Sequence, residues 1–227
     1  MTRAIGGYFV HAYTASGVGC GWLALVAGLH GDVRTALLWL VAATFIDATD
    51  GALARLADVA RTAPRIDGAR LDDIVDYVTY VVVPGVLVWR ADLLPPLAAP
   101  WIVGATLVAS ALGFARSDAK TDDHFFTGFP SYWNIVAVYL IALRPAPLTA
   151  AAILLTLAAL VFVPIRYVYP SRTVFLRPLT LALGAAWAVA FVGVIWWLPA
   201  PPPWLVWASL LYLVYYVALS LWLTARR

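Results

Sequence analysis

Apolar runs long enough to cross a lipid bilayer recur from one end of this sequence to the other. A helix needs about 20 consecutive apolar residues to span the hydrocarbon core. Eight runs are predicted as membrane spans: 8–29, 34–54, 71–89, 98–115, 131–143, 148–168, 179–198 and 204–224. Hydrophobic residues make up 63% of the chain and charged residues only 12%, a composition that excludes an ordinary soluble domain. We therefore expect an all-α polytopic membrane protein of about eight transmembrane helices, folded as a single domain over residues 1–227.

The basic residues predict how these spans are oriented. With the N-terminus inside, the outside connections hold only Arg34, Arg90 and Arg144. The inside segments then hold the other twelve basic residues: Arg3, Arg55, Arg61, Arg65, Arg70, Arg116, Lys120, Arg166, Arg172, Arg177, Arg226 and Arg227. This excess predicts that both termini face the cytoplasm. The topology also accounts for the net charge of +3, so no nucleic-acid partner is expected.

All twelve acidic residues are aspartates, and four of them belong to two helical stripes. At 3.6 residues per turn, each stripe occupies one face of its helix. The first, on a helix predicted over about 34–55, comprises Asp47, Asp50, Gly51 and Ala54, and the second, over about 68–89, comprises Gly68, Asp72, Asp76 and Tyr80. Asp73 points roughly 100° away from the second stripe and is a weaker candidate. A short inner connection makes the two helices antiparallel neighbours, so their aspartates are expected to meet near the cytoplasmic end.

Four carboxylates on facing helices need a chemical explanation, because an ionisable residue in a membrane span is costly. They would repel one another unless cations neutralised them. Mg²⁺ and Mn²⁺ prefer carboxylate oxygens and commonly bridge to substrate phosphates. Gly51 and Ala54 let a bulky polar ligand approach the backbone, and Arg55 is placed to bind a phosphate. The structural alternatives are an Asp–Arg pair, an ion path or a proton relay, and they leave these small residues and the arginine unexplained.

The two stripes and Arg55 together resemble the signature of the CDP-alcohol phosphatidyltransferases, membrane enzymes that transfer a phosphatidyl or similar group from a CDP-linked donor to an alcohol. All eight signature positions are filled: Asp47, Asp50, Gly51, Ala54, Arg55, Gly68, Asp72 and Asp76. Twelve residues separate Arg55 from Gly68, a longer gap than in most of the family, and this resembles the bacterial phosphatidylcholine synthase branch. The likeness extends to segments 11–17, 120–130, 133–134, 169–172 and 176–179. His11 departs from the pattern, since many relatives carry Asn there.

The resemblance implies a reaction in which CDP-diacylglycerol and choline give phosphatidylcholine and CMP. The implied metal ligands, for two divalent cations of Mn²⁺ or Mg²⁺, are Asp47, Asp50, Asp72 and Asp76. Asp76 is also implied as the general base that takes the proton of the choline hydroxyl. The implied CDP-binding residues are Thr14, Asp47, Asp50, Gly51, Ala54, Arg55 and Gly68. The resemblance further implies a homodimer in the bacterial inner membrane, in contact with membrane lipid, with its active site on the cytoplasmic side.

Choline poses a separate problem, since its quaternary ammonium cannot donate a hydrogen bond. Aromatic faces and nearby carboxylates are the usual solution. The candidate choline-binding residues are Tyr77, Tyr80, Phe125, Phe126, Tyr132 and Trp133, although ordinary packing also explains aromatic residues in such segments. Two roles are open for three arginines of the later inner segments, Arg166, Arg172 and Arg177. They bind phosphate or anionic lipid, or they serve only to orient the protein with its positive residues inside.

Other readings remain open at the level of sequence. The same chemistry could serve serine, glycerol phosphate or inositol phosphate as the acceptor. A phosphate-bearing acceptor would require extra Arg or Lys in the cavity, and the aromatic segment 124–133 suits a cation better. A metal-ion or proton-coupled transporter would show inverted repeats and broken helices in matching halves, which the sequence does not display. A complete set of aspartates argues against an inactive scaffold.

Overall fold

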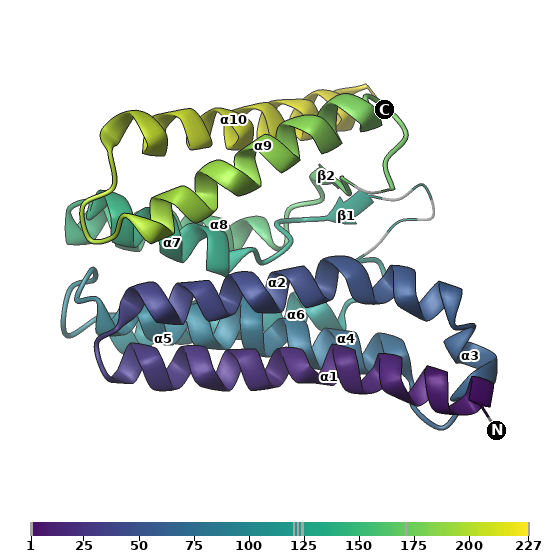
Figure 1. Cartoon of the computed structure of the whole chain (residues 1–227). Coiled ribbons are helices and arrows are strands. Elements are labelled where there is room, and N and C mark those ends of the chain that lie inside the picture. The colour runs from purple at the N-terminus through teal and green to yellow at the C-terminus, as the bar shows by residue number, and fades with distance from the viewer. Residues whose placement is uncertain (1, 120, 122, 124, 171, 227) are drawn as a thin grey trace.

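The computed structural model describes residues 2–119, 121, 123, 125–170 and 172–226, and this part of the chain is mostly helical (Figure 1). Lys120 and Arg227, which contribute to the charge bias, lie outside the described residues. The helices are α1 (Thr2–Leu29), α2 (Val33–Leu56), α3 (Val59–Thr62), α4 (Gly68–Asp76), the π-helix η1 (Tyr77–Val82), α5 (Val83–Arg90), α6 (Ala99–Ala115), α7 (Trp133–Leu143), α8 (Pro147–Leu160), α9 (Arg177–Trp196) and α10 (Pro203–Ala225). Each predicted apolar run contains a helix.

The helices differ in whether they are long enough to cross a membrane. In the described part of the chain, four are long and apolar enough by length and composition: α1 from Ile5 onward, α2, α9 and α10. Helices α6, α7 and α8 are apolar but shorter. The chain from Gly68 to Arg90 runs through α4, η1 and α5 as one continuous helix. The structure is therefore that of a helical membrane protein, while the number of eight spans stays a prediction.

A small antiparallel sheet corrects the all-helical expectation. Strand β1 (Phe125–Thr127) pairs with β2 (Arg166–Val168), and Phe126 lies opposite Tyr167. The predicted run 148–168 is wrong at its C-terminal end, because α8 stops at Leu160. Pro164 has no backbone N–H and cannot continue a helix, so the apolar residues after it form a strand instead.

Side chains of helix α10 hydrogen-bond to the backbone at the outer edge of this sheet. The Tyr216 hydroxyl donates to the carbonyl of Val168 at 2.9 Å, and Ser220 Oγ accepts from the backbone N–H of Val168 at 3.1 Å. The backbone N–H of Arg166 donates to Thr224 Oγ1 at 2.9 Å. A strand edge needs such partners when no third strand covers it. The end of β2, and Tyr169 directly after it, are thereby fixed against α10.

Helix α1 packs closely on the continuous helix 68–90 through glycines. A β-carbon at Gly17 would lie 2.6 Å from Cγ1 of Val75, and one at Gly28 would lie 2.2 Å from Cδ2 of Leu87. Small residues allow helix backbones to approach in this way. Gly31, whose φ is +84°, forms the tight turn between α1 and α2. Both aspartate-bearing helices are therefore held against α1.

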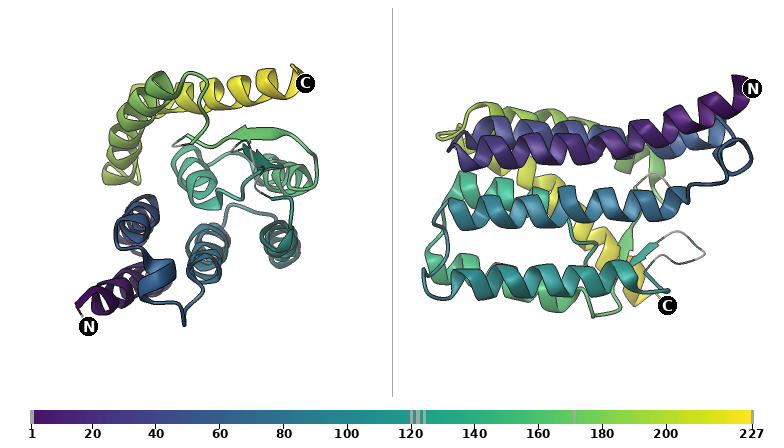
Figure 2. Two further views of the ribbon diagram at one scale, coloured as in Figure 1. Left: turned by 90° about the vertical axis from the view of Figure 1, so that its right-hand side faces the viewer. Right: turned by 90° about the horizontal axis from the view of Figure 1, so that it is seen from below.

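The segments that the basic residues predict to lie on the cytoplasmic side gather at one end of the bundle. Both termini lie at this end, together with the connections from α2 to α4, from α6 to α7 and from α8 to α9 (Figure 1). Helices α9 and α10 pack over the side of the bundle opposite α1, as the view along the bundle also shows (Figure 2). The aspartate stripes lie near the same end, one on the C-terminal part of α2 and the other along α4 and into η1.

Candidate active site

Three of the predicted metal ligands come together between α2 and α4. Asp47 and Asp50 project from α2 and Asp72 from α4, and one carboxylate oxygen from each lies within 4.8 Å of the others. Asp50 is only 7% exposed, and the other two are half-buried. Asp76, one turn beyond Asp72, does not belong to this three-carboxylate group. We refer to Asp47, Asp50 and Asp72 as the aspartate cluster.

The chemistry of the aspartate cluster fits a hard divalent cation. Three carboxylates this close together repel one another, and a bound cation removes that cost. Oxygen-only donors match Mg²⁺ and Mn²⁺, which retain water and substrate oxygens as further ligands. The local structure supports the arrangement, because Asp67 caps α4 by accepting from the backbone N–H groups of Ala69 and Arg70. This cap fixes the first turn of the helix that carries Asp72.

A larger cavity, of about 560 Å³, opens on one side of the aspartate cluster. Its volume falls within the range of small-molecule sites, roughly 300–1,000 Å³. Six of the seven residues that the resemblance implies for CDP line it: Thr14, Asp50, Gly51, Ala54, Arg55 and Gly68. The seventh, Asp47, lines a different cavity. Asp72 also lines the larger cavity, so the cluster forms part of its wall.

His11 contributes a polar atom to the larger cavity. The residue is 5% exposed, and its Nε2 has no hydrogen-bond partner among the described residues. Its ring packs on Gly68, where a β-carbon would lie only 3.3 Å from Cε1 of His11. Gly68 thus leaves room for the imidazole ring of His11 at the wall of the larger cavity.

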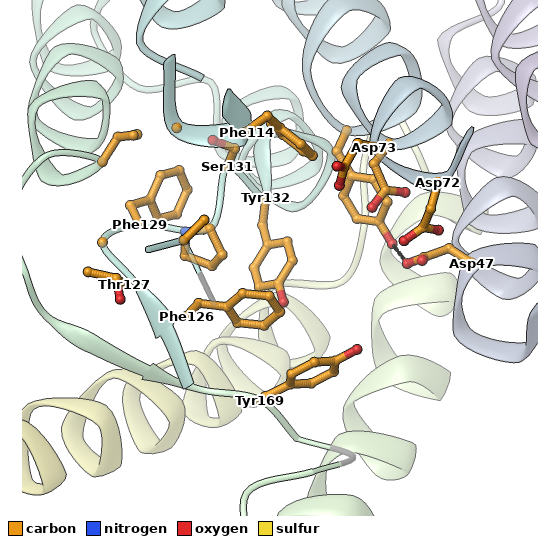
Figure 3. A pocket seen from close by; sticks show the side chains of 17 residues that line it. Asp47, Asp72, Asp73, Phe114, Phe126, Thr127, Phe129, Ser131, Tyr132 and Tyr169 are labelled. Atoms are coloured by element: carbon orange, nitrogen blue, oxygen red, sulfur yellow. Dashed lines mark hydrogen bonds between the residues drawn. The ribbon is translucent and has the colours of Figure 1, made fainter. Parts of the chain in front are cut away.

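A smaller cavity, of about 170 Å³, opens on the other side of the aspartate cluster. Asp47, Asp72 and Asp73 lie along one side of it, and Phe126, Tyr132 and Tyr169 lie across from them (Figure 3). Asp76, Tyr80, Phe114 and Phe129 also line it. Since Asp72 lines both cavities, the cluster stands between them.

The aromatic wall of the smaller cavity is a connected series of rings. Phe126 and Tyr169 stack at 4.7 Å between ring centroids with an interplanar angle of 27°. Tyr132 meets Phe126 edge-on at 6.4 Å, and Tyr80 lies 6.0 Å from Tyr132. The rings come from β1, the residue after β2, the residue before α7 and the π-helix η1. Segments far apart in the sequence therefore build one aromatic surface, which lies across from the carboxylates at Phe126, Tyr132 and Tyr169 and reaches Asp47 through Tyr80.

The structure separates the six predicted choline-binding residues into two groups. Tyr80, Phe126 and Tyr132 line the smaller cavity, whereas Tyr77, Phe125 and Trp133 do not. The hydroxyl of Tyr77 donates to the carbonyl of Leu107, and the indole N–H of Trp133 donates to Ser110 Oγ.

Phe125 and Phe126 are neighbours on a strand, so their side chains point to opposite faces. Phe126 lines the smaller cavity. Phe125 instead packs against Arg166, whose guanidinium carbon lies 4.0 Å from the centre of the Phe125 ring. Only one of the two adjacent rings can face the site.

Sequence reasoning undervalued two residues of the smaller cavity. Asp73 lines it although it lies away from the Asp72–Asp76 stripe, because the cavity extends around α4 toward the α6–β1 connection. Tyr169 was part of the family-like segment 169–172 but was not considered for choline. Its position between an apolar segment and a polar turn gave no sign that β2 would pair with β1 and stack the Tyr169 ring on Phe126.

Arginines organise the connections around the smaller cavity. Arg116 donates to both carboxylate oxygens of Asp118, and these hydrogen bonds lower the pKa of that carboxyl from its ordinary value. It also donates to the carbonyl of Val161 at 3.1 Å. Arg166 pairs with Asp123, and the guanidinium carbon of Arg172 lies 5.8 Å from the centre of the Tyr169 ring.

Comparisons with known proteins agree with the sequence pattern. No family model matches the chain. The chain is similar to the phosphatidylcholine synthase of Pseudomonas aeruginosa, with 37% identity over 217 residues that cover 96% of this chain and 91% of that protein. The phosphatidylcholine synthase of Legionella pneumophila is 42% identical over 178 residues, 78% of this chain and 69% of that protein. That of Legionella bozemanae is 48% identical over 141 residues, 61% of this chain and 65% of that protein.

Proposed function

The chain belongs to the phosphatidylcholine synthase family, and on that premise we propose that it transfers the phosphatidyl group of CDP-diacylglycerol to choline, with release of CMP. The observation that carries this proposal is the position of Asp72, which lines both cavities. A donor in the larger cavity and an alcohol in the smaller one would then meet at the aspartate cluster.

The donor is proposed to bind with its CDP group in the larger cavity. Arg55 offers a fork of N–H donors that suits a phosphate. The small residues Gly51 and Ala54 leave space for the donor at this wall of the cavity. A β-carbon added at Gly51 would lie 3.5 Å from Nη1 of Arg55. The buried Nε2 of His11 can hydrogen-bond to the nucleotide. The acyl chains would extend from this site into the membrane.

The acceptor is proposed to bind in the smaller cavity. Its volume is close to that of a cavity known to hold benzene, about 150 Å³, which suits a compact alcohol such as choline. The stacked rings of Phe126 and Tyr169 offer faces to the trimethylammonium group, a contact that contributes about 0.5–2 kcal/mol. Asp73 adds negative charge to the same cavity. No basic side chain lines the smaller cavity in the described part of the chain, which disfavours an acceptor that carries a phosphate.

Asp76 is proposed as the general base. It lines the smaller cavity, and its Oδ1 is buried. The carboxylate would take the proton of the choline hydroxyl while the choline oxygen bonds to the phosphorus that carries diacylglycerol. The bond from that phosphorus to the CMP oxygen then breaks. Asp47, Asp50 and Asp72 would hold Mn²⁺ or Mg²⁺, whose positive charge stabilises the attacking and leaving oxygens.

The cellular arrangement is also a proposal. The arginine-rich connections and both termini are assigned to the cytoplasmic face of a bacterial inner membrane, because positive residues are retained on that side. A fluorescent protein fused after Arg227 should then fluoresce, and a phosphatase fused there should be inactive. We also propose that the chain folds as a single domain and, as the resemblance implies, forms a homodimer. The mass of the detergent-solubilised protein tests whether it is a dimer.

The proposed acceptor is tested by assaying purified protein with CDP-diacylglycerol and Mn²⁺. Choline, serine, glycerol 3-phosphate and inositol phosphate would be supplied separately, and CMP release would be measured. We expect CMP release with choline alone. Release with serine or a phosphate-bearing alcohol, at a rate equal to that with choline, would reject the assignment of the smaller cavity.

A further inference from the structure

Tyr80 touches both the aspartate cluster and the smaller cavity. Its hydroxyl donates to Oδ2 of Asp47 at 2.7 Å, the dashed line that ends on Asp47 in Figure 3. Its ring lines the smaller cavity and lies 6.0 Å from the ring of Tyr132. The residue is only 7% exposed, so packing holds both contacts in place.

The π-helix η1 explains how Tyr80 reaches Asp47 on another helix. A π turn has an i→i+5 hydrogen-bond pattern and rotates the chain less per residue than an α turn. Tyr80 therefore stays near the line of Asp72 and Asp76 instead of drifting around the helix. Single π turns within α-helices frequently occur at functional sites.

We propose that Tyr80 is a positioning residue, which holds the Asp47 carboxylate in its metal-binding orientation and links the acceptor cavity to the aspartate cluster. A hydroxyl bonded to one oxygen of a ligating carboxylate restricts its rotation, as partners outside the ligand shell commonly do. The inference deepens the proposed function, because it assumes that Asp47 is a metal ligand. It assigns separate roles to two parts of one side chain: the hydroxyl acts on the metal site and the ring on the acceptor.

Tyr80→Phe tests the hydroxyl alone, because it retains the ring. Mn²⁺ binding would be measured on detergent-solubilised protein without substrates, by electron paramagnetic resonance of the free ion. We expect the Mn²⁺ dissociation constant to rise by about 10- to 100-fold, the range found when such supporting partners are removed. The KM for choline, measured at saturating Mn²⁺, should stay within about twofold of wild type because the ring remains. Tyr80→Ala should raise both quantities.

Tyr13→Phe provides a matched control. The Tyr13 hydroxyl also contacts α2 at 2.7 Å, but its partner is the hydroxyl of Thr49 and not a carboxylate. Both variants remove one tyrosine hydroxyl bond to the same helix, so a loss of Mn²⁺ affinity only in Tyr80→Phe supports positioning. An equal loss in Tyr13→Phe, or none in Tyr80→Phe, would overturn the inference. If wild-type protein itself bound no Mn²⁺, the proposed metal site would fail first, so the two failures are distinguishable.

Discussion

The carboxylates of Asp47 and Asp72 come from different helices, yet their oxygens approach within 4.8 Å. Helix α1 packs on both helices, and Gly17 and Gly28 allow it to come close to the helix that carries Asp72. This contact defines the boundary between the two cavities and is the basis of the first prediction.

Asp72→Asn should remove activity and at the same time stabilise the metal-free protein. Loss of a carboxylate ligand weakens charge stabilisation in the transition state, and we expect activity to fall by about 100-fold or more. Without metal, the same change relieves repulsion within the aspartate cluster, so the unfolding temperature in EDTA should rise. Asp92, which follows the C-terminal end of α5, lies at the opposite end of the bundle. Asp92→Asn is therefore the control and should change neither the activity nor the unfolding temperature. A lower unfolding temperature for Asp72→Asn in EDTA would contradict the repulsion that we infer.

Asp76→Asn should separate chemistry from nucleotide binding. Loss of a positioned base reduces turnover by about 10²- to 10⁴-fold, while the larger cavity, which Asp76 does not line, stays intact. Calorimetry of CMP binding and a turnover assay on the same preparation would measure both quantities. Turnover like that of wild type would exclude Asp76 as the base.

The two adjacent phenylalanines of β1 should respond differently to substitution. Phe126→Leu removes a ring from the smaller cavity and should raise the KM for choline by about 3- to 30-fold, the equivalent of one cation–π contact. Phe125→Leu removes a ring from the opposite face of the strand and should leave that KM near the wild-type value. Steady-state kinetics with choline as the varied substrate provide the comparison. Equal effects of the two substitutions would mean that the change acts through the stability of the strand.

Gly68→Ala should act on the donor and not on the acceptor. The new methyl group would lie 3.3 Å from the His11 ring and displace it within the larger cavity. We expect a higher KM for CDP-diacylglycerol and an unchanged KM for choline. Gly104→Ala is a matched control, because no heavy atom lies within 4 Å of its added β-carbon. A rise in the KM for choline as large as that for the donor would argue against two separate cavities.

The helical architecture and the aspartate pairing were predictable from local patterns. Apolar runs of membrane length predict helices directly. The spacing of Asp47 from Asp50, and of Asp72 from Asp76, predicts which side chains share a helix face. The signature also predicted the family, which the comparisons confirm. These features depend on residues close together in the sequence.

The aromatic wall could not be predicted in the same way, because it depends on contacts between distant segments. Phe126 and Tyr169 meet only after β1 pairs with β2 and α10 fixes the edge of that sheet. Segment 161–168 is apolar enough to resemble a continued helix, so its strand was missed. The π-helix η1 also has no sequence signal that we recognised, although Tyr80 itself was expected on the stripe of Asp72 and Asp76.

Competition between acceptors is the decisive test of whether the smaller cavity selects choline. Purified protein would receive CDP-diacylglycerol, Mn²⁺ and equal concentrations of choline, serine and glycerol 3-phosphate, and the lipid products would be identified by mass spectrometry. We expect phosphatidylcholine to dominate and Phe126→Leu to reduce its share. A product mixture dominated by another phospholipid, or by phosphatidylcholine in a proportion that Phe126→Leu leaves unchanged, would contradict the proposal that the smaller cavity selects choline.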